Sequence, residues 1–167
     1  MSTVSLTLDE IFDLAKKTLL ANGCDDETAS TLSDLIRNAE RDGSLSHGLF
    51  RLPAYVSGLK SGKINGKGKP EVQKVSPSVI KVKGNNCLAP VVLSKGLPEL
   101  AKAAKENGVA VLAINNSHHM AAMWPETEKL AEEGLVAFAC TSYKPAVAPA
   151  GAIKPLFGTN PISFAWP

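Results

Sequence analysis

A histidine and an arginine stand four residues apart in the stretch Ser46-His47-Gly48-Leu49-Phe50-Arg51. If the stretch is helical, positions i and i+4 share a face, and both side chains would point into one space. A guanidinium presents a planar set of donors that can bind a carboxylate at two points. A histidine can donate a proton near neutral pH. The pair predicts a site for a small carboxylate substrate that needs a proton at the neighbouring atom, and a solvated helix face is the alternative.

The backbone around this pair is constrained by Pro53, which is tolerated in the first turn of a helix and costly inside it. We therefore expect a helix that begins near Arg51, with His47 in the preceding turn, or else a kinked helix. Both leave His47 on irregular backbone, where catalytic groups are common. Ser46 is adjacent to His47, which suits a helix cap or a hydrogen bond to the imidazole better than a nucleophile.

Two amphipathic helices precede the motif and carry no chemistry of their own. Apolar residues recur at helical spacing after Thr7, which is placed as an N-cap with Glu10 as its capping-box partner. The second helix is expected to begin at Asp25 or Asp26 and to end at Arg41. Both helices are expected to serve packing or dimer contacts.

Strands and helices alternate along the rest of the chain, which predicts the α/β class. The apolar runs at 109–114 and 135–140 are typical of strands covered on both faces, and the helix between them predicts a crossover unit. Residues 60–69, rich in Gly and Lys, predict a flexible surface loop rather than a phosphate site, and residues 145–161 predict a long ordered loop. The other expected elements are one or two strands over 72–82, a turn at 84–86, one or two helices over 89–107, a helix from Met120 to Glu133 with Pro125 in its first turn, and a buried strand over 161–166.

A second polar cluster, Asn116-Ser117-His118-His119, follows a predicted strand and precedes a predicted helix. Ligands of α/β proteins bind at that edge of a sheet, so a cofactor or substrate pocket is one interpretation, and capping residues with a satisfied histidine are the other. Adjacent histidines point apart and no cysteine or carboxylate cluster completes a zinc site, so we expect no metal. The sequence has no Gly-x-Gly-x-x-Gly, Walker or Gly-x-Ser-x-Gly motif, which argues against a Rossmann site and a serine hydrolase.

Composition narrows the class of protein further. Apolar residues make up 44% of the chain and charged residues 20%, and the net charge is +2. These values indicate a globular protein and give no argument for binding nucleic acid or a membrane surface. Cys24, Cys87 and Cys140 are far apart and odd in number, which predicts free thiols. We expect a cytoplasmic protein, because no signal peptide or membrane-spanning run is evident.

A predicted strand ends directly at Pro167, whereas domains usually end in an expendable surface segment. The sequence therefore looks truncated, and an inactive fragment with a structural or dimerisation role is an alternative function. An intact mass about twice that of the 167 residues would show that the sequence is partial. If the mass matches instead, we expect little turnover.

Three motifs in order resemble the malate/L-lactate dehydrogenase family of non-Rossmann NAD(P)H oxidoreductases. They are Ser46-His47-Gly48-x-x-Arg51, Ser117-x-His119 before an Ala-rich segment, and Pro149-x-Gly151 followed by Leu156-Phe157-Gly158-Thr159-Asn160-Pro161. The segments Met120–Pro125 and Lys154–Pro161 are most similar to one branch, the Δ1-piperideine-2-carboxylate/Δ1-pyrroline-2-carboxylate reductases. Asn85-Asn86-Cys87 and Ala152 depart from the family pattern, and both changes affect backbone freedom more than reactive groups.

The resemblance implies a role for each motif. His47 would be the general acid with Ser46 as its relay partner, Arg51 would hold the substrate carboxylate, and Thr159 would contact the substrate. The nicotinamide cofactor, NADPH or alternatively NADH, would contact a stretch of five residues. These are His119, Met120, Ala121, Ala122 and Met123.

The resemblance also implies an N-terminal helical segment, 1–62, that carries the first motif, and a mixed α/β cofactor and substrate domain, 63–167, that is incomplete at its C-terminus. Family chains are homodimers of roughly twice this length, with a relay aspartate beyond the point where this sequence stops. The implied reaction is reduction of small cyclic imine carboxylates to L-pipecolate or L-proline. A malate, lactate or ureidoglycolate dehydrogenase is the alternative enzyme.

Overall fold

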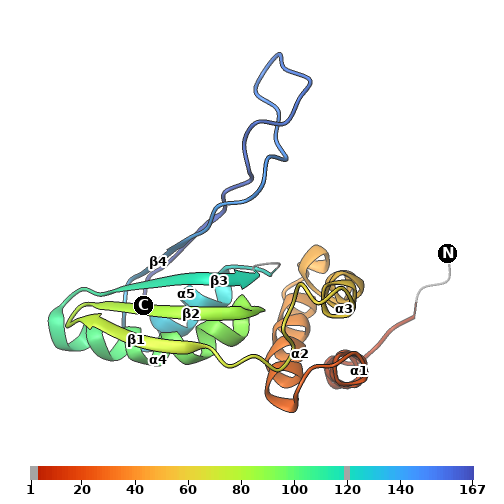
Figure 1. The fold of residues 1–167 in the computed structure, drawn as a ribbon, viewed down its shortest axis with the longest axis horizontal. Coiled ribbons are helices and arrows are strands. Elements are labelled where there is room, and N and C mark those ends of the chain that lie inside the picture. The colour runs from red at the N-terminus through yellow and green to blue at the C-terminus, as the bar shows by residue number, and fades with distance from the viewer. Residues whose placement is uncertain (1–3, 119–120) are drawn as a thin grey trace. The chain divides into compact units, whose positions relative to one another are not determined.

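The computed structural model describes residues 4–118 and 121–167, and within these ranges it confirms the α/β class (Figure 1). The chain divides into two compact units, one ending at Ala122 and one beginning at Met123. The predicted division at residues 62 and 63 lies within the first unit and stays a prediction.

The first unit contains α1 (Leu8–Ala21), α2 (Asp26–Arg41), the 3-10 turns η1 (Leu45–His47) and η2 (Leu49–Arg51), α3 (Leu52–Lys60), β1 (Glu71–Ser76), β2 (Val79–Leu88), α4 (Ala89–Asn107) and β3 (Val111–His118). The second contains α5 (Trp124–Glu132), β4 (Ala137–Cys140) and β5 (Ile162–Ala165).

The helical layer of the first unit begins as predicted. Thr7 caps α1 in a capping box, in which its hydroxyl accepts from the amide of Glu10 and the Glu10 carboxylate accepts from the amide of Thr7 at 2.7 Å. Asp25 caps α2 and accepts from the amide of Thr28 at 2.9 Å. One face of each helix is apolar, and these faces bury a shared core with α3. Its members include Ile11, Leu19, Leu32, Ile36, Tyr55, Ile64 and, from the end of β2, Leu88.

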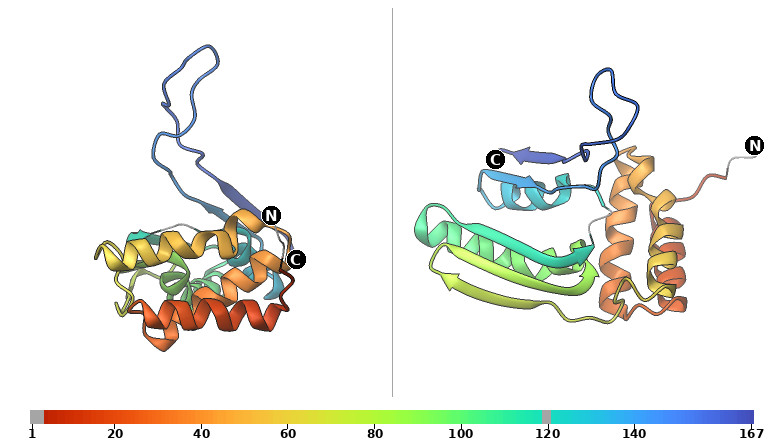
Figure 2. Two further views of the ribbon diagram at one scale, coloured as in Figure 1. Left: turned by 90° about the vertical axis from the view of Figure 1, so that its right-hand side faces the viewer. Right: turned by 45° about the horizontal axis from the view of Figure 1, so that its top comes forward.

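The sheet of the first unit has the order β1-β2-β3, with β1 antiparallel and β3 parallel to β2. Helix α4 connects β2 to β3 and lies along one face of this sheet (Figures 1 and 2). Alternate residues such as Ile80 and Val82 are buried on that face, while Lys81 and Lys83 between them are exposed. The side chains of this sheet are therefore covered on one face by α4, and the strands follow a period of two.

This arrangement corrects two predictions about the strands. The run 109–114 was expected to be covered on both faces, but Val111 on β3 is 57% exposed because α4 covers only the opposite face. The crossover was expected between the strands on either side of α5. The parallel crossover is instead β2-α4-β3, and β4 pairs in antiparallel fashion with β5 in a separate sheet. Strand pairing joins distant segments, so local periodicity could not choose between these partners.

The predicted turn at 84–86 is also wrong, because β2 continues through it as a bulge. The register with β3 shifts between Lys83 and Cys87, and Asn85 and Asn86 have φ values of 49° and 62°. Asparagine tolerates this left-handed region, so the signal typical of a turn produces a bulge within a strand. The side-chain amide of Asn85 donates hydrogen bonds to the main-chain carbonyl of Lys69 and to the Glu71 carboxylate, both at 2.8 Å, and these bonds fix the bulge.

Helix α4 is one continuous helix, although Gly96 and Pro98 left two segments possible. A Cβ at Gly96 would lie 2.9 Å from the Leu112 side chain and 3.1 Å from Val82. Gly96 therefore allows the helix to approach the sheet closely. Gly108 ends the helix in the left-handed conformation, as predicted.

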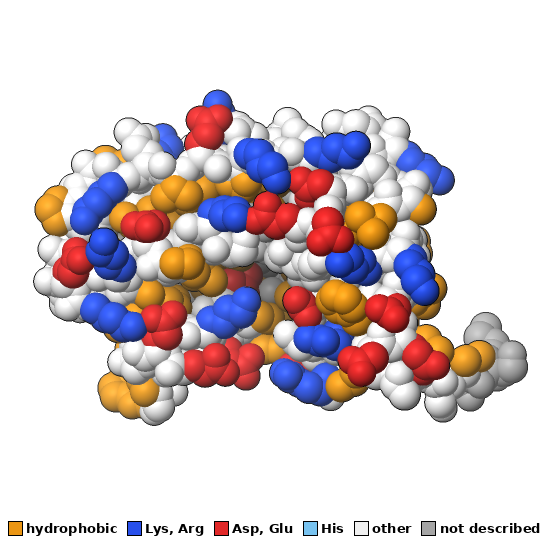
Figure 3. All heavy atoms as spheres, turned by 90° about the horizontal axis from the view of Figure 1, so that it is seen from below, with side chains coloured by type: hydrophobic (Ala, Val, Ile, Leu, Met, Phe, Trp, Pro, Cys, Tyr) orange, Lys and Arg blue, Asp and Glu red, His pale blue; other side chains and the backbone are white. Residues whose placement is uncertain are grey.

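Residues 61–70 are more firmly held than the predicted flexible loop. Ile64 is buried, its amide donates to Gly58, and the carbonyl of Gly66 accepts from the amide of Asp25 at 2.9 Å. Lys69 pairs with Asp25 and Glu27, and Glu27 also pairs with Lys95. Basic and acidic side chains of the described residues are mixed over the face shown in Figure 3.

The second unit packs α5 against the hairpin of β4 and β5. The hydroxyls of Thr127 on α5 and Ser163 on β5 are 2.7 Å apart. Helix α5 begins at Trp124 with Pro125 in its first turn, which confirms the predicted place of Pro125 but not the predicted start at Met120. Both strands are more exposed than predicted, with Phe138 63% exposed. Residues 141–161 form a long arm between them (Figure 1), in which Val147 bridges to Phe157.

The described helices include none long and apolar enough to cross a membrane. The three cysteines are free, with Cys24 and Cys87 buried and Cys140 exposed. Burial, reinforced by the negative charge of Asp25, raises the pKa of the Cys24 thiol to about 11. Burial also raises the pKa of Cys87.

These environments predict selective thiol reactivity. At pH 8 a thiol of pKa about 11 is ionised in about one molecule per thousand, and only the thiolate reacts. With Ellman's reagent we expect one fast thiol per native chain, that of Cys140, and three after denaturation. Cys140→Ser should remove the fast phase, whereas Cys24→Ser should leave it unchanged. Fast reaction of two or three thiols in the native protein would contradict this assignment.

Candidate active site

The stretch from Ser44 to Arg51 folds as two successive 3-10 turns rather than as one helix. The amide of His47 donates to the carbonyl of Ser44 at 2.8 Å, and that of Arg51 donates to the carbonyl of Gly48 at 2.9 Å. Gly48 separates the turns, with φ −88° and ψ −135°. Helix α3 begins immediately afterwards at Leu52, with Pro53 in its first turn. The structure thus selects the first of the two predicted geometries, in which His47 precedes the helix.

The imidazole of His47 is half-buried and its Nδ1 atom is engaged by serine hydroxyls. The Oγ atom of Ser46 lies 2.9 Å from Nδ1, and that of Ser44 lies 3.4 Å away. Hydrogen bonds at one ring nitrogen orient the ring and select its tautomer. Ser46 makes the hydrogen bond suggested by the sequence, and Ser44 is an additional partner that the sequence did not reveal. Its only signal is its position three residues before His47, within the same turn.

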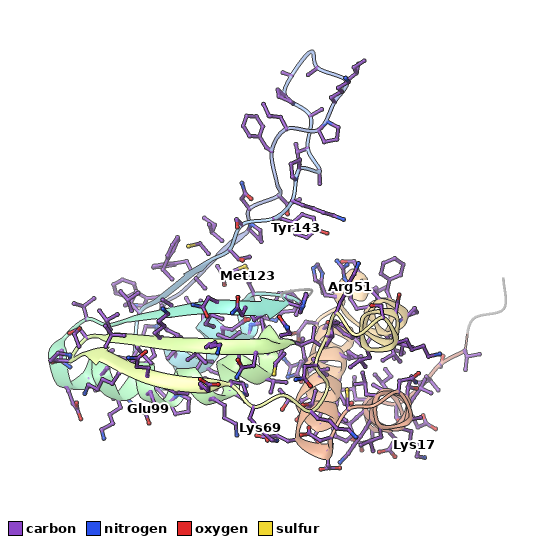
Figure 4. The ribbon with its side chains drawn as sticks, in the orientation of Figure 1. Lys17, Arg51, Lys69, Glu99, Met123 and Tyr143 are labelled. Carbon is purple, nitrogen blue, oxygen red and sulfur yellow. The ribbon has the colours of Figure 1, made fainter. Side chains whose placement is uncertain are left out.

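Arg51 is half-buried at the start of α3 (Figure 4), and its Nε atom is buried with no hydrogen-bond partner among the described residues. Tyr55 lies one helical turn further on and is fully buried. Burial raises the pKa of the Tyr55 hydroxyl to about 12, and the nearby positive charge of Arg51 offsets part of the rise. A buried guanidinium donor without a partner is costly, so a bound anion would satisfy it.

The described residues of the second polar cluster, Asn116 to His118, lie within β3 rather than after it. Ser117 and His118 pair with Cys87 and Leu88, at the carboxyl ends of the two parallel strands. Since Leu88 belongs to the core of the helical layer, these strand ends point toward the layer that carries His47 and Arg51 (Figures 1 and 2).

The predicted cofactor stretch is described in part. His119 and Met120 lie outside the described residues. Ala121 and Ala122 are buried at the end of the first unit, and Met123 begins the second unit as the N-cap of α5. Their contact with a cofactor stays a prediction.

Thr159 is exposed on the arm of the second unit. The residues beside it are tightly held, because the Asn160 side chain accepts from the amide of Tyr143 at 2.9 Å. A Cβ at Gly158 would lie 2.7 Å from the carbonyl carbon of Tyr143. The local geometry of Thr159 is therefore defined, and its predicted role toward the substrate stays a prediction.

Metal ligands are not grouped in the part of the chain that the structure describes. No three His, Cys, Asp or Glu side chains there converge on a common point. What the described residues bring together is an oriented imidazole and a guanidinium with an unpartnered buried donor, on two adjoining turns. The guanidinium can bind an anion, and the imidazole can transfer a proton.

Comparison with known proteins places this arrangement in a family. The model of malate/L-lactate dehydrogenases matches residues 6–167, and the chain belongs to this family. A Δ1-pyrroline-2-carboxylate/Δ1-piperideine-2-carboxylate reductase of Pseudomonas syringae pv. tomato is 41% identical over 165 residues, which cover 99% of this chain and 48% of the relative. The protein of the same name from Pseudomonas putida is 42% identical over 166 residues, which cover 99% of this chain and 49% of the relative.

Solved structures show the same fold. The crystal structure of Δ1-piperideine-2-carboxylate reductase from Pseudomonas syringae matches with a TM-score of 0.92 at 41% identity, over 99% of this chain and 50% of the other. Malate dehydrogenase from Pyrococcus horikoshii matches with a TM-score of 0.90 at 32% identity, over 98% of this chain and 47% of the other. The chain thus spans about half the length of the relatives it matches.

Proposed function

We propose that the protein is an NADPH-dependent reductase of small cyclic imine carboxylates, such as Δ1-piperideine-2-carboxylate and Δ1-pyrroline-2-carboxylate. The observation that carries this proposal is the buried Nε atom of Arg51, which has no hydrogen-bond partner in the described structure and lies on the 3-10 turn directly after the turn of the oriented His47. The similarity to reductases of these two substrates in Pseudomonas supports the choice of substrate.

In this proposal the protein binds the substrate through its carboxylate. Arg51 binds the carboxylate and thereby orients the adjacent C=N bond, which removes rotational freedom before the reaction. His47 holds the proton for the imine nitrogen, and Ser46 and Ser44 hold the imidazole ring in place at Nδ1. Tyr55, uncharged over the neutral pH range, packs one turn beyond Arg51 and adds no competing charge.

The nicotinamide cofactor would supply the hydride for the imine carbon. Ala121, Ala122 and Met123 are the described residues that would contact it, and His119 and Met120, which precede them in the sequence, are the other proposed contacts. The fit rests on two observations. First, the side chains of the two alanines are methyl groups. Second, the Met123 side chain makes no hydrogen bond to the first turn of α5, and main-chain amides at the start of a helix can donate hydrogen bonds to anionic cofactor groups. We also propose a cytoplasmic homodimer, and exposed apolar residues such as Phe138 and Ile153 support an assembly that covers them.

A second candidate is a 2-hydroxy-acid dehydrogenase, favoured by the likeness to the malate dehydrogenase of Pyrococcus horikoshii. The same residues can serve it, because a keto acid also presents a carboxylate beside the atom that receives the proton.

Substrate comparison tests the proposal directly. We expect the purified protein to oxidise NADPH faster with Δ1-piperideine-2-carboxylate than with pyruvate or oxaloacetate at equal concentration. Repeating the assay with NADH measures the cofactor preference. Faster turnover of the keto acids would overturn the imine assignment in favour of the dehydrogenase.

A further inference from the structure

The two turns that carry His47 and Arg51 are held by a side chain from the helix before them. Glu40, half-buried near the C-terminal end of α2, accepts a hydrogen bond at Oε1 from the amide of Leu49 at 2.7 Å. The contact spans nine residues of sequence and joins a side-chain oxygen of α2 to a main-chain amide of η2.

The contact falls at the junction between the turns. The main-chain hydrogen bonds of this described segment lie within one turn or anchor its start, as does the 2.8 Å bond from the amide of Ser44 to the carbonyl of Ala39. Leu49 is the first residue of η2, and Gly48 before it separates η2 from η1. The Glu40 carboxylate therefore fixes the point where the direction of the chain changes between His47 and Arg51.

Gly48 is buried against the same carboxylate. A Cβ at this position would lie 2.6 Å from Cδ of Glu40 and closer still to Oε1. The glycine is therefore required by the close approach of Glu40, and a methyl group there would displace the carboxylate from the Leu49 amide. Gly48 and Glu40 form a single contact that depends on both residues.

We propose that Glu40 is a positioning residue, which sets the placement of His47 relative to Arg51 through the amide of Leu49. This inference rests on the proposed function of the two turns. Glu40 touches neither the substrate nor the proton, and it acts through its acceptor oxygen rather than through its charge. A displacement of about 1 Å between catalytic groups can reduce the rate by about two orders of magnitude.

The test compares Glu40→Ala, which removes the acceptor, with Glu40→Gln, which keeps an acceptor oxygen and removes the charge. Asp34→Ala is the matched control, because Asp34 is an exposed acidic residue of the same helix whose partner is Arg37. Hydrogen exchange measured by mass spectrometry over residues 45–51 reports the Leu49 amide without requiring turnover. We expect Glu40→Ala to accelerate exchange at this amide at least about tenfold, and we expect Glu40→Gln and Asp34→Ala to stay close to the parent protein.

In the imine reductase assay we expect Glu40→Ala to lower kcat/KM about 10- to 100-fold through both kcat and KM. Glu40→Gln should restore most of the activity. Unchanged exchange in Glu40→Ala would overturn the inference, and so would a Glu40→Gln variant as impaired as Glu40→Ala, since the charge would then be the requirement. If the parent protein turns over no imine although its intact mass matches the length of its relatives, the proposed function fails, and the exchange results still decide whether Glu40 holds the turns.

A double-mutant cycle provides a second test that does not depend on the folding of one variant. Gly48→Ala alone should accelerate exchange over residues 45–51 as Glu40→Ala does, because the methyl group displaces the carboxylate. In the Glu40→Ala background the same substitution should have a much smaller effect, which is the non-additivity expected of residues in direct contact. Additive effects would overturn the inference.

Discussion

Replacing Arg51 with alanine is expected to lower kcat/KM for a cyclic imine carboxylate by about 100- to 1000-fold, because a desolvated charge pair contributes about 3–4 kcal/mol. Most of the loss should appear in KM, since the guanidinium holds the carboxylate before and during the reaction. Steady-state NADPH oxidation over a range of substrate concentrations measures both constants.

Two further variants show whether the loss of kcat/KM comes from the binding of the carboxylate. Arg51→Lys keeps the positive charge but loses the planar pair of donors, and we expect it to recover only part of the affinity. Arg37→Ala removes a half-buried arginine of α2 that pairs with Asp34, and it should leave kcat/KM unchanged. Equal losses in Arg51→Ala and Arg37→Ala would show that general charge, rather than binding of the carboxylate, explains the effect.

Replacing His47 with glutamine is expected to lower kcat by about 100- to 10,000-fold, the usual range for the loss of a general acid. KM should change little, because Arg51 still binds the carboxylate. A general acid is active when protonated, so in the parent protein the rate should fall as the pH rises. His47→Gln should lose this dependence. Rates measured under saturating substrate from pH 5 to pH 9, about two units on either side of neutrality, test this.

Ser46→Ala serves as the graded control for this prediction. It removes the hydroxyl at 2.9 Å from Nδ1 and leaves the one of Ser44 at 3.4 Å, so we expect a smaller loss of kcat, about tenfold. If His47→Gln retained the parent pH profile, the proton donor would be a different group.

The helices could be predicted from the sequence because their boundaries depend on near neighbours. Thr7 with Glu10, Asp25, and Gly108 act on amides or carbonyls within four residues, and each begins or ends a helix as predicted. The sheets could not be predicted to the same extent. Whether β3 pairs with β2 or β4 depends on where α4 packs, and the role of Gly96 in that packing is invisible to periodicity.

The candidate site likewise contains residues that could be predicted from the sequence and one that could not. Ser46, His47 and Arg51 lie within six residues, so spacing and Pro53 were enough to predict either a helix that begins near Arg51 with His47 in the turn before it or a kinked helix, and the structure shows the first. Glu40 escaped notice because its contact with Leu49 requires α2 to end and the chain to fold back on it.

The presence of Leu88 in the core of the helical layer has a consequence for folding. This residue ends β2, so the core formed by α1, α2 and α3 is complete only after the strand has been placed. The helices of residues 8–60 therefore gain part of their stability from a segment that is synthesised later, and the first unit is expected to fold cooperatively rather than helix by helix. The two turns with His47 and Arg51 lie between these partners in sequence, so they acquire their shape only when both are in place.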